Sequence, residues 1–261
     1  MRKIYYIMRG FAKKFYYETV FFAYRIKVKV DDFLCPHQKL KIFVTGFQHS
    51  GTSILRKIIG NHKDIQDILN EVDFRAVMRP NTSPSVYVMK SPNCDNRVFK
   101  ACKIASHIKI VCIVKDPRDV LVSLEKRSGG EYHLEKFKKE WCECVQNSIA
   151  ISKWPHGYLV RYEDLFKDNY REVEKLFNWL ELPYDESVIT KNKNRIAPIA
   201  TDSIPQDEPP RTEHASFRSY QINQEFRQMS GQYKNELLRE KQINIENDPL
   251  VRELMVSLKY L

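Results

Sequence analysis

The sequence predicts an α/β fold, a three-layer sandwich in which a central, mostly parallel sheet is flanked by helices. From residue 41 onward, short apolar runs alternate with longer amphipathic segments, which is the pattern of an open parallel sheet. The run 108–114 is almost continuously apolar, as expected for a parallel strand that is buried on both faces. A glycine-containing loop, 46–53, joins the first apolar run to a helix. Such a loop is typical of phosphate-binding sheets, so the expected fold is P-loop-like.

The elements of the amino-terminal half follow from this alternation. The apolar run 42–44 predicts a strand, and the apolar spacing over 53–60 predicts a helix after it. A polar turn at 61–64 ends that helix, and 86–89 predicts a second short strand. We expect a helix over 96–106, and then the buried strand 108–114. Pro117, with acidic residues beside it, is typical of the first turn of the next helix.

In the carboxyl-terminal half, the periodicity predicts a long helix over 134–153, a strand over 157–162 and a helix over 169–180. The segment 192–210 contains four prolines and few large apolar residues, which predicts a loop or lid. A final helix is expected over 226–241. We therefore expect one domain over 39–261, preceded by a separate segment, 1–38.

Charge and cysteine usage narrow the class of partner. The 261-residue chain has 43 basic and 33 acidic residues and a net charge of +10, which favours an anionic partner. The basic residues are spread along the whole chain rather than clustered, so we expect no nucleic acid partner. The six cysteines, including the Cys142-x-Cys144 pair, do not have zinc-ligand spacing. We therefore expect no metal site.

The segment 1–38 is rich in Tyr, Phe, Lys and Arg. Charged residues interrupt each of its apolar stretches, so it predicts neither a transmembrane helix nor a secretory signal. Two alternatives remain open: a helix that packs its aromatic face on the domain, or an amphipathic stretch over 1–30 that lies on an anionic membrane. Without a membrane anchor we expect a cytoplasmic protein, which in the second alternative is peripheral at the inner membrane face.

The loop 46–53 has the glycine spacing of a phosphate-binding P-loop. Gly46 is followed after four residues by Gly51, Thr52 and Ser53, with Thr52 in place of the usual lysine. Backbone N–H groups, the helix N-terminus and the hydroxyl groups can all donate to an anion. The missing lysine argues against ordinary ATP or GTP hydrolysis, in which that lysine reaches the β- and γ-phosphates.

Three segments in order resemble sulfotransferases that use 3′-phosphoadenosine 5′-phosphosulfate (PAPS). The segment 45–53 is similar to the family's 5′-phosphosulfate loop, 114–123 to its 3′-phosphate motif R-x-P-x-x-x-x-x-S, and 160–165 to its V-R-Y-E-D-L segment. The resemblance covers residues 40–185 well and is closer to the Golgi, bacterial and tyrosylprotein types than to the cytosolic small-molecule type. It implies PAPS as cofactor, 3′-phosphoadenosine 5′-phosphate (PAP) as product, and no metal requirement.

The resemblance also implies the residues that bind the cofactor. At the 5′ end these are His49, Ser50, Gly51, Thr52 and Ser53; at the 3′ end and beside the nucleotide they are Lys115, Ser123, Arg127, Tyr162 and, in the late cofactor-contacting stretch, Arg218. The chain departs from the family pattern twice. Lys115 stands where the family has arginine, and His49 stands where it usually has lysine or arginine. An imidazole is charged only below a pKa near 6.5.

Sulfuryl transfer to a hydroxyl needs a general base and a donor to the leaving oxygen. The resemblance implies Glu71 as the base, with Asp73 as a nearby competitor. It implies Lys90, in a K-x-P element, as the donor, together with His49. Two alternatives are open: Lys90 carries the positive charge alone, or the anionic cofactor keeps His49 protonated.

The sequence thus predicts an enzyme that transfers a sulfuryl group from PAPS to a hydroxyl of a carbohydrate or glycolipid. Tyrosine in a peptide remains an alternative acceptor. The first alternative function is a P-loop kinase or NTPase, which Thr52 opposes. The second is a non-catalytic protein with a sulfotransferase-like fold, which His49 and Lys115 favour. The sequence does not indicate an oligomeric state.

Overall fold

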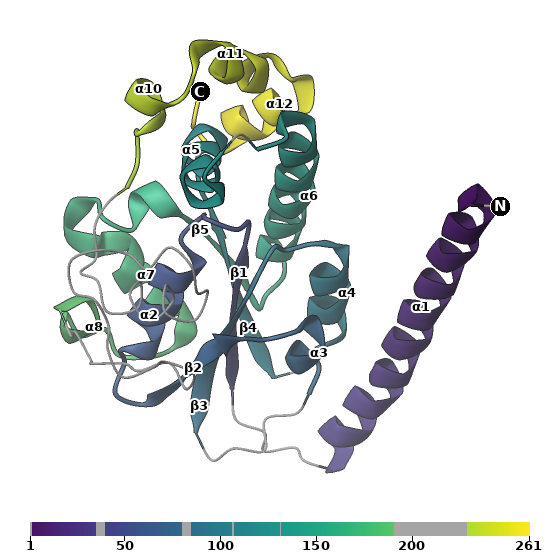
Figure 1. Ribbon diagram of the computed structural model, residues 1–261. Coiled ribbons are helices and arrows are strands. Elements are labelled where there is room, and N and C mark those ends of the chain that lie inside the picture. The colour runs from purple at the N-terminus through teal and green to yellow at the C-terminus, as the bar shows by residue number, and fades with distance from the viewer. Residues whose placement is uncertain (1, 35–39, 80–84, 106, 131, 191–228) are drawn as a thin grey trace, which may run out of the picture.

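The central element of the molecule is a sheet of parallel strands (Figure 1). The structure is a computed structural model that describes residues 2–34, 40–79, 85–105, 107–130, 132–190 and 229–261. Within these residues the sheet has five strands in the order β2-β3-β1-β4-β5, and each neighbouring pair is parallel. The strands are β1 (Lys41–Gly46), β2 (Ile65–Glu71), β3 (Val86–Pro92), β4 (Ile108–Val114) and β5 (Gly157–Arg161). The expected parallel sheet is confirmed.

Helices cover both faces of this sheet, which confirms the three layers. One face carries α2 (Thr52–Gly60), α7 (Arg171–Leu180) and α8 (Ser187–Thr190); the other carries α3 (Phe74–Val77), α4 (Asn96–Ile104) and α6 (Leu134–Ser152). The core lies in two clusters, one on each side. In β1, Ile42 and Val44 join the cluster beneath α2, while Phe43 joins the opposite one, as strand geometry requires.

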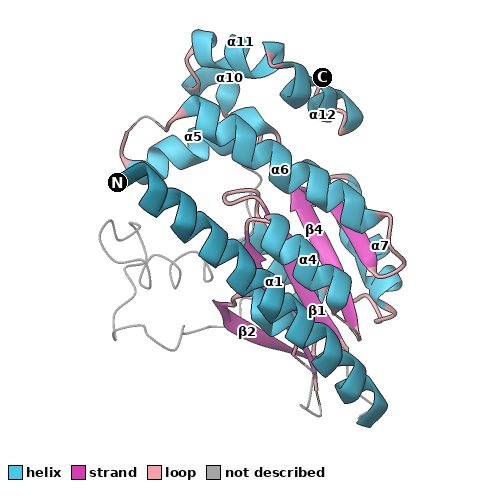
Figure 2. Ribbon diagram, turned by 90° about the vertical axis from the view of Figure 1, so that its right-hand side faces the viewer, coloured by secondary structure: helices cyan, strands magenta, loops and turns pink. Residues whose placement is uncertain are grey.

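The remaining helices lie at the carboxyl edge of the sheet and outside it. At the edge are α5 (Pro117–Ser128), α10 (Tyr233–Glu236), α11 (Arg239–Asn247) and α12 (Pro249–Ser257), and outside α4 lies α1 (Arg2–Leu34) (Figure 2). Tyr17 and Phe21 of α1 contact Phe74, and Glu18 pairs with Lys100 of α4. The expected domain boundary at 38–39 lies outside the described residues. No described helix is both long and apolar enough to cross a bilayer.

Two expectations about elements are wrong. Strand β2 was not expected, and Glu71, placed by the sequence after a turn, lies at its end. The strand escapes notice because it is at the sheet edge and carries polar residues such as Gln66 and Asn70. The described part of the expected helix 226–241 is broken, because the backbone is extended at Leu237 and Leu238, and α12 follows unforeseen.

The turn from β1 into α2 depends on two glycines. A Cβ atom on Gly46 would lie 2.2 Å from the carbonyl oxygen of Ile113, so only glycine lets β1 approach β4 here. Gly51, at the start of α2, has φ 95°, a left-handed conformation that glycine adopts without strain. The backbone N–H of Gln48 donates to Asn93 Oδ1 at 3.0 Å, which ties the loop to the end of β3.

Candidate functional site

Three of the residues predicted for catalysis and cofactor binding meet at the carboxyl edge of the sheet. The Lys90 ammonium donates to Glu71 Oε1 at 2.8 Å and to Ser53 Oγ at 2.9 Å. Strand register creates this contact, because Glu71 of β2 pairs with Lys90 of β3. Lys90 was expected just after a strand, but it lies inside β3. Its side chain is only 6% exposed and that of Glu71 is 26% exposed, so the ion pair is mostly shielded from water.

A buried arginine that the sequence analysis did not single out contacts the strand that carries Glu71. Arg56 lies on α2, and its Nε is 3.2 Å from Asp67 Oδ1 in β2. Its guanidinium also donates to the carbonyl oxygens of Ile68 and Leu69. The β2–β3 register shifts between Asp67 and Glu71, so Arg56 holds the irregular part of the strand that presents Glu71. The sequence does contain a signal for this role, because Arg56 is a charged residue within the apolar face of 54–59.

The loop 46–53 has the properties of an anion cradle. Ser50 is fully buried, and its Oγ has no hydrogen-bond partner among the described residues. Buried hydroxyl groups nearly always have such a partner, so an acceptor from outside the protein fits here. At the start of α2, Gly51 provides no side-chain cap for the helix N-terminus, and Thr52 and Ser53 follow in its first turn. These groups fit a phosphate or sulfate group.

His49 connects the loop to α5. Its Nδ1 lies 2.8 Å from Ser123 Oγ, and its backbone φ is 63°. Burial, together with the positive charges of Arg127, Lys115 and Lys90, lowers the pKa of His49 from 6.5 to about 4. The imidazole in this structure is therefore neutral near pH 7, and it can exchange one hydrogen bond with Ser123 but adds no charge. Ser123, Arg127 and Lys115 thus surround His49.

Lys115 and Tyr162 lie together at the end of β4 and β5, as the sequence predicted for the nucleotide site. The Lys115 ammonium is 4.4 Å from the centre of the Tyr162 ring. It donates to the Met229 carbonyl oxygen at 2.6 Å, and the Met229 N–H donates to the Tyr162 hydroxyl at 3.0 Å. Burial lowers the pKa of Lys115 and raises that of Tyr162 to about 12. The backbone at Met229 therefore belongs to this part of the site, although the sequence did not identify it.

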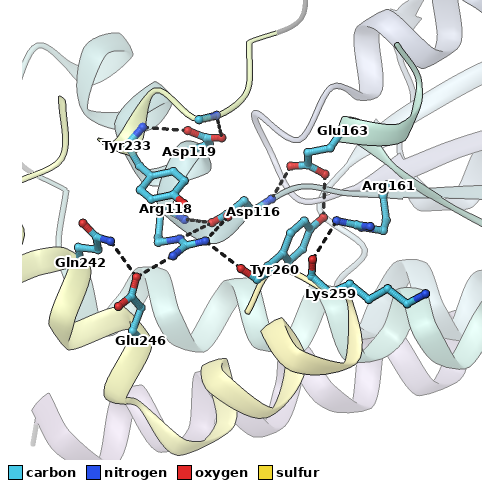
Figure 3. A network of polar contacts seen from close by, with 11 residues as sticks. Asp116, Arg118, Asp119, Arg161, Glu163, Tyr233, Gln242, Glu246, Lys259 and Tyr260 are labelled. Atoms are coloured by element: carbon cyan, nitrogen blue, oxygen red, sulfur yellow. Dashed lines mark hydrogen bonds and ion pairs between the residues drawn. The ribbon is translucent and has the colours of Figure 1, made fainter. Parts of the chain in front are cut away.

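Polar contacts around Arg118 attach the carboxyl-terminal helices to the site (Figure 3). Arg118 donates to Asp116 Oδ2 at 2.6 Å and to Glu246 Oε1 at 2.6 Å. Asp119 accepts from the N–H groups of Gly231 at 2.6 Å and Tyr233 at 3.0 Å. Asp116 caps α5 by accepting from the Arg118 N–H. These contacts hold the segment that includes Met229 against the start of α5.

Glu163 connects the same network to β5. It accepts from the Asp116 N–H at 3.0 Å and from the Tyr260 hydroxyl at 3.1 Å (Figure 3). The segments 114–123 and 160–165, far apart in the sequence, are thereby joined. The remaining predicted contact, Arg218, lies outside the described residues. Among the residues that the structure does describe, no cluster of three or more His, Cys, Asp or Glu side chains could hold a metal ion.

The comparisons with known proteins identify the family of the chain. The family model described as "Sulfotransferase domain" matches residues 39–248. The chain is 25% identical to the 3-alpha-hydroxysteroid sulfotransferase of Cavia porcellus over 194 residues, which are 63% of this chain and 66% of that protein. It is 27% identical to human carbohydrate sulfotransferase 1 over 103 residues, 31% of this chain and 25% of the relative. The chain thus spans less than two thirds of either curated relative.

A solved structure, that of mouse sulfotransferase SULT7A1 complexed with PAP, has the same fold. The TM-score is 0.56 at 14% identity, with 85% of this chain and 89% of that chain covered. The parallel sheet and its flanking helices therefore recur in a protein whose sequence has diverged far.

Proposed function

The chain belongs to the sulfotransferase domain family, and from this we propose that it transfers the sulfuryl group of PAPS to an acceptor hydroxyl. The observation that carries the proposal is the contact of Lys90 with both Glu71 and Ser53. It places one ammonium group within hydrogen-bonding distance of both a carboxylate and the anion cradle. Proton removal from a hydroxyl beside a departing anion requires a carboxylate and a cation next to an anion cradle, which is what these residues supply.

Each residue then has a distinct task. The Glu71 carboxylate accepts the proton of the acceptor hydroxyl, and Lys90 donates to the bridging oxygen on which negative charge develops. Ser50, Thr52 and Ser53 hold the 5′ end of the nucleotide through hydroxyl and backbone N–H groups. PAPS supplies the activated sulfuryl group, and positioning accounts for much of the rate because such transfers are loose.

The far end of the nucleotide needs a second anion site. Ser123 and Arg127 on α5, with Lys115 at the end of β4, supply a hydroxyl and two cations around His49. A lysine ammonium binds phosphate as a point charge and lacks the bidentate geometry of arginine. Arg127 can compensate for this, because it lies one turn beyond Ser123 on the same face of α5. We therefore include Arg127 among the groups that hold the 3′-phosphate.

For the acceptor we propose a hydroxyl of a carbohydrate or glycolipid. The net charge of +10 favours an anionic acceptor, as many glycans are. The similarity to human carbohydrate sulfotransferase 1 supports the same class, although a steroid sulfotransferase is also among the relatives. We further propose a cytoplasmic location, because the five described cysteines are buried free thiols and free thiols persist in reducing compartments.

One observation favours a second candidate, a non-catalytic protein that binds the nucleotide. His49 is neutral at a position where related loops carry a positive charge. If that charge is indispensable, the chain binds PAP but transfers nothing. Turnover of labelled PAPS with any acceptor rejects this candidate.

The test of the proposal is isothermal titration of the purified chain with PAP, with ATP as the control and magnesium absent. We expect micromolar binding of PAP and much weaker binding of ATP. An acceptor screen with 35S-labelled PAPS then measures transfer to glycans, glycolipids, steroids and tyrosine peptides. Absence of PAP binding, or a preference for magnesium-ATP, would overturn the proposal in favour of a kinase or NTPase.

A further inference from the structure

The outer face of α1 is an apolar surface that the described chain leaves uncovered. Four large side chains follow one another along this face, Phe15, Phe22, Ile26 and Phe33, and their exposed fractions are 77%, 65%, 52% and 85%. Their spacing of seven, four and seven residues puts them on one stripe of the helix. We call these four residues the outer stripe. Exposed apolar residues that are contiguous in this way mark an interaction site more often than isolated ones do.

The opposite face of α1 accounts for its attachment to the domain. Phe21 and Val28 are buried there, 4% and 6% exposed, and Phe21 contacts Phe74. The outer stripe therefore takes no part in holding α1 against α4. Figures 1 and 2 show α1 as the outermost layer on this side of the molecule. The helix thus has two apolar faces, of which the domain uses one.

The charges beside the outer stripe indicate what covers it. Lys and Arg outnumber Asp and Glu by eight to three in α1. Arg25 and Lys29 are exposed on one side of the stripe, and Lys27 is exposed on the other. The three acidic residues of α1, in contrast, are engaged: Glu18 pairs with Lys100, Asp31 with Lys27 and Asp32 with His107. The uncovered face is consequently apolar at its centre and cationic along the margin of Arg25 and Lys29, while Lys27 on the other margin is neutralised by Asp31.

We propose that the outer stripe docks on an anionic membrane surface, with α1 lying in the plane of the interface. Aromatic and aliphatic side chains enter the boundary between headgroups and acyl chains, while flanking lysine and arginine side chains reach the anionic headgroups. The surface belongs to α1 alone and contains none of the residues assigned to sulfuryl transfer. The inference therefore stands or falls independently of the proposed function.

A second copy of this chain fits the stripe less well than a membrane does. Phe15, Phe22 and Lys29 are seven residues apart, so they occupy the same position of a heptad repeat. A coiled coil formed through this face would bury the Lys29 ammonium in its seam, which costs stability. At a membrane the same lysine extends its aliphatic part along the apolar region and keeps its charge among the headgroups.

The test is cosedimentation of the full chain with vesicles, in low salt. Vesicles of phosphatidylcholine alone are compared with vesicles that also contain phosphatidylglycerol. We expect binding to the anionic vesicles, with a loss of roughly tenfold or more in the double variant Phe22→Glu/Ile26→Glu, because two apolar side chains no longer enter the interface. Raised salt and the variant Arg25→Gln/Lys29→Gln should also weaken binding.

The matched control is Leu250→Glu/Val256→Glu, which changes two exposed apolar residues of α12, 41% and 53% exposed. It should bind vesicles like the wild type, and circular dichroism should show an unchanged fold for all three double variants. Failure of the wild type to bind anionic vesicles overturns the proposal. So does equal binding by the Phe22→Glu/Ile26→Glu variant, or sedimentation of the wild type as a dimer that this variant dissociates while neither binds vesicles.

Discussion

Replacing Glu71 by glutamine tests the assignment of the general base. The amide oxygen of Glu71→Gln can still accept from the Lys90 ammonium, which is 2.8 Å from Glu71 Oε1, so the local geometry should survive. What is lost is the ability to take a proton. A positioned general base contributes about 10²–10⁴-fold to the rate, so we expect kcat to fall by about that factor. PAP affinity should change by less than about threefold, because Glu71 is not among the groups assigned to the phosphates.

Stability gives the second part of this prediction. Lys90 is nearly buried, so replacing its charged partner by a neutral one is unfavourable, but the retained hydrogen bond limits the cost to about 1–2 kcal/mol. Urea unfolding, titration with PAP and initial rates with labelled PAPS measure the three quantities separately. Asp73→Asn is the matched control, because Asp73 is 51% exposed and caps α3 through a bond that asparagine can also make. The assignment would be refuted if the kcat of Glu71→Gln stayed within about tenfold of the wild-type kcat. It would also be refuted if Asp73→Asn lowered kcat as much as Glu71→Gln does.

Three further substitutions test the loop, its support and its histidine. Gly51→Ala should weaken PAP binding at least about tenfold in isothermal titration, because φ is 95° at this residue and the new Cβ would lie 2.5 Å from Tyr162 Cδ2. An unchanged affinity would contradict the assignment of this loop as the anion cradle. Arg56→Leu should lower the free energy of unfolding in urea by about 3–5 kcal/mol, because Asp67 stays buried without its cation. The double variant Arg56→Leu/Asp67→Leu should recover part of that loss, and no recovery would contradict the pairing. The pKa of His49, about 4, lies below that of the unfolded chain, so the unfolded state binds more protons and stability falls as pH drops from 7.5 to 5, by up to about 2 kcal/mol. The variant His49→Asn, which tolerates the positive φ, should show a shallower fall in thermal midpoint, and an equal fall would argue against the shifted pKa.

The strands could be predicted where they contain an apolar run. The run 108–114 lies in the middle of the sheet with helices on both faces, so nearly every side chain must be apolar and the signal is strong. Strand β2 is at the edge and pairs on one side alone, so Gln66 and Asn70 are tolerated there and the apolar run disappears. The other edge strand, β5, keeps the apolar run 158–160 and was predicted, so the polar residues of β2, rather than its edge position alone, hide it in the sequence. Glu71 terminates this missed strand, so its pairing with Lys90 of β3 could not be predicted from the sequence.

The same limit applies to the carboxyl-terminal helices. Their order depends on contacts with residues more than a hundred positions away, such as those of Asp119 with Gly231 and Tyr233. Hydrogen bonds from two backbone N–H groups to a distant carboxylate leave no local pattern in the sequence. The apolar periodicity over 226–241 therefore predicted one continuous helix. Arg56 illustrates the opposite case. Its position in an apolar helix face is visible in the sequence. Its role, however, depends on a register shift in β2, which the sequence does not reveal.

The distribution of positive charge explains how a P-loop without its lysine still suits an anion. In nucleotide-hydrolysing P-loops the lysine belongs to the loop itself, so its positive charge contacts the same phosphate chain that the loop binds. Here Thr52 and the neutral His49 leave the loop uncharged, and the cations come from neighbouring strands: Lys90 from β3 and Lys115 at the end of β4. β1 lies between β3 and β4 in the sheet, so the two ammonium groups approach the loop from opposite sides. Such an arrangement favours a ligand with two separate anionic ends over a linear triphosphate.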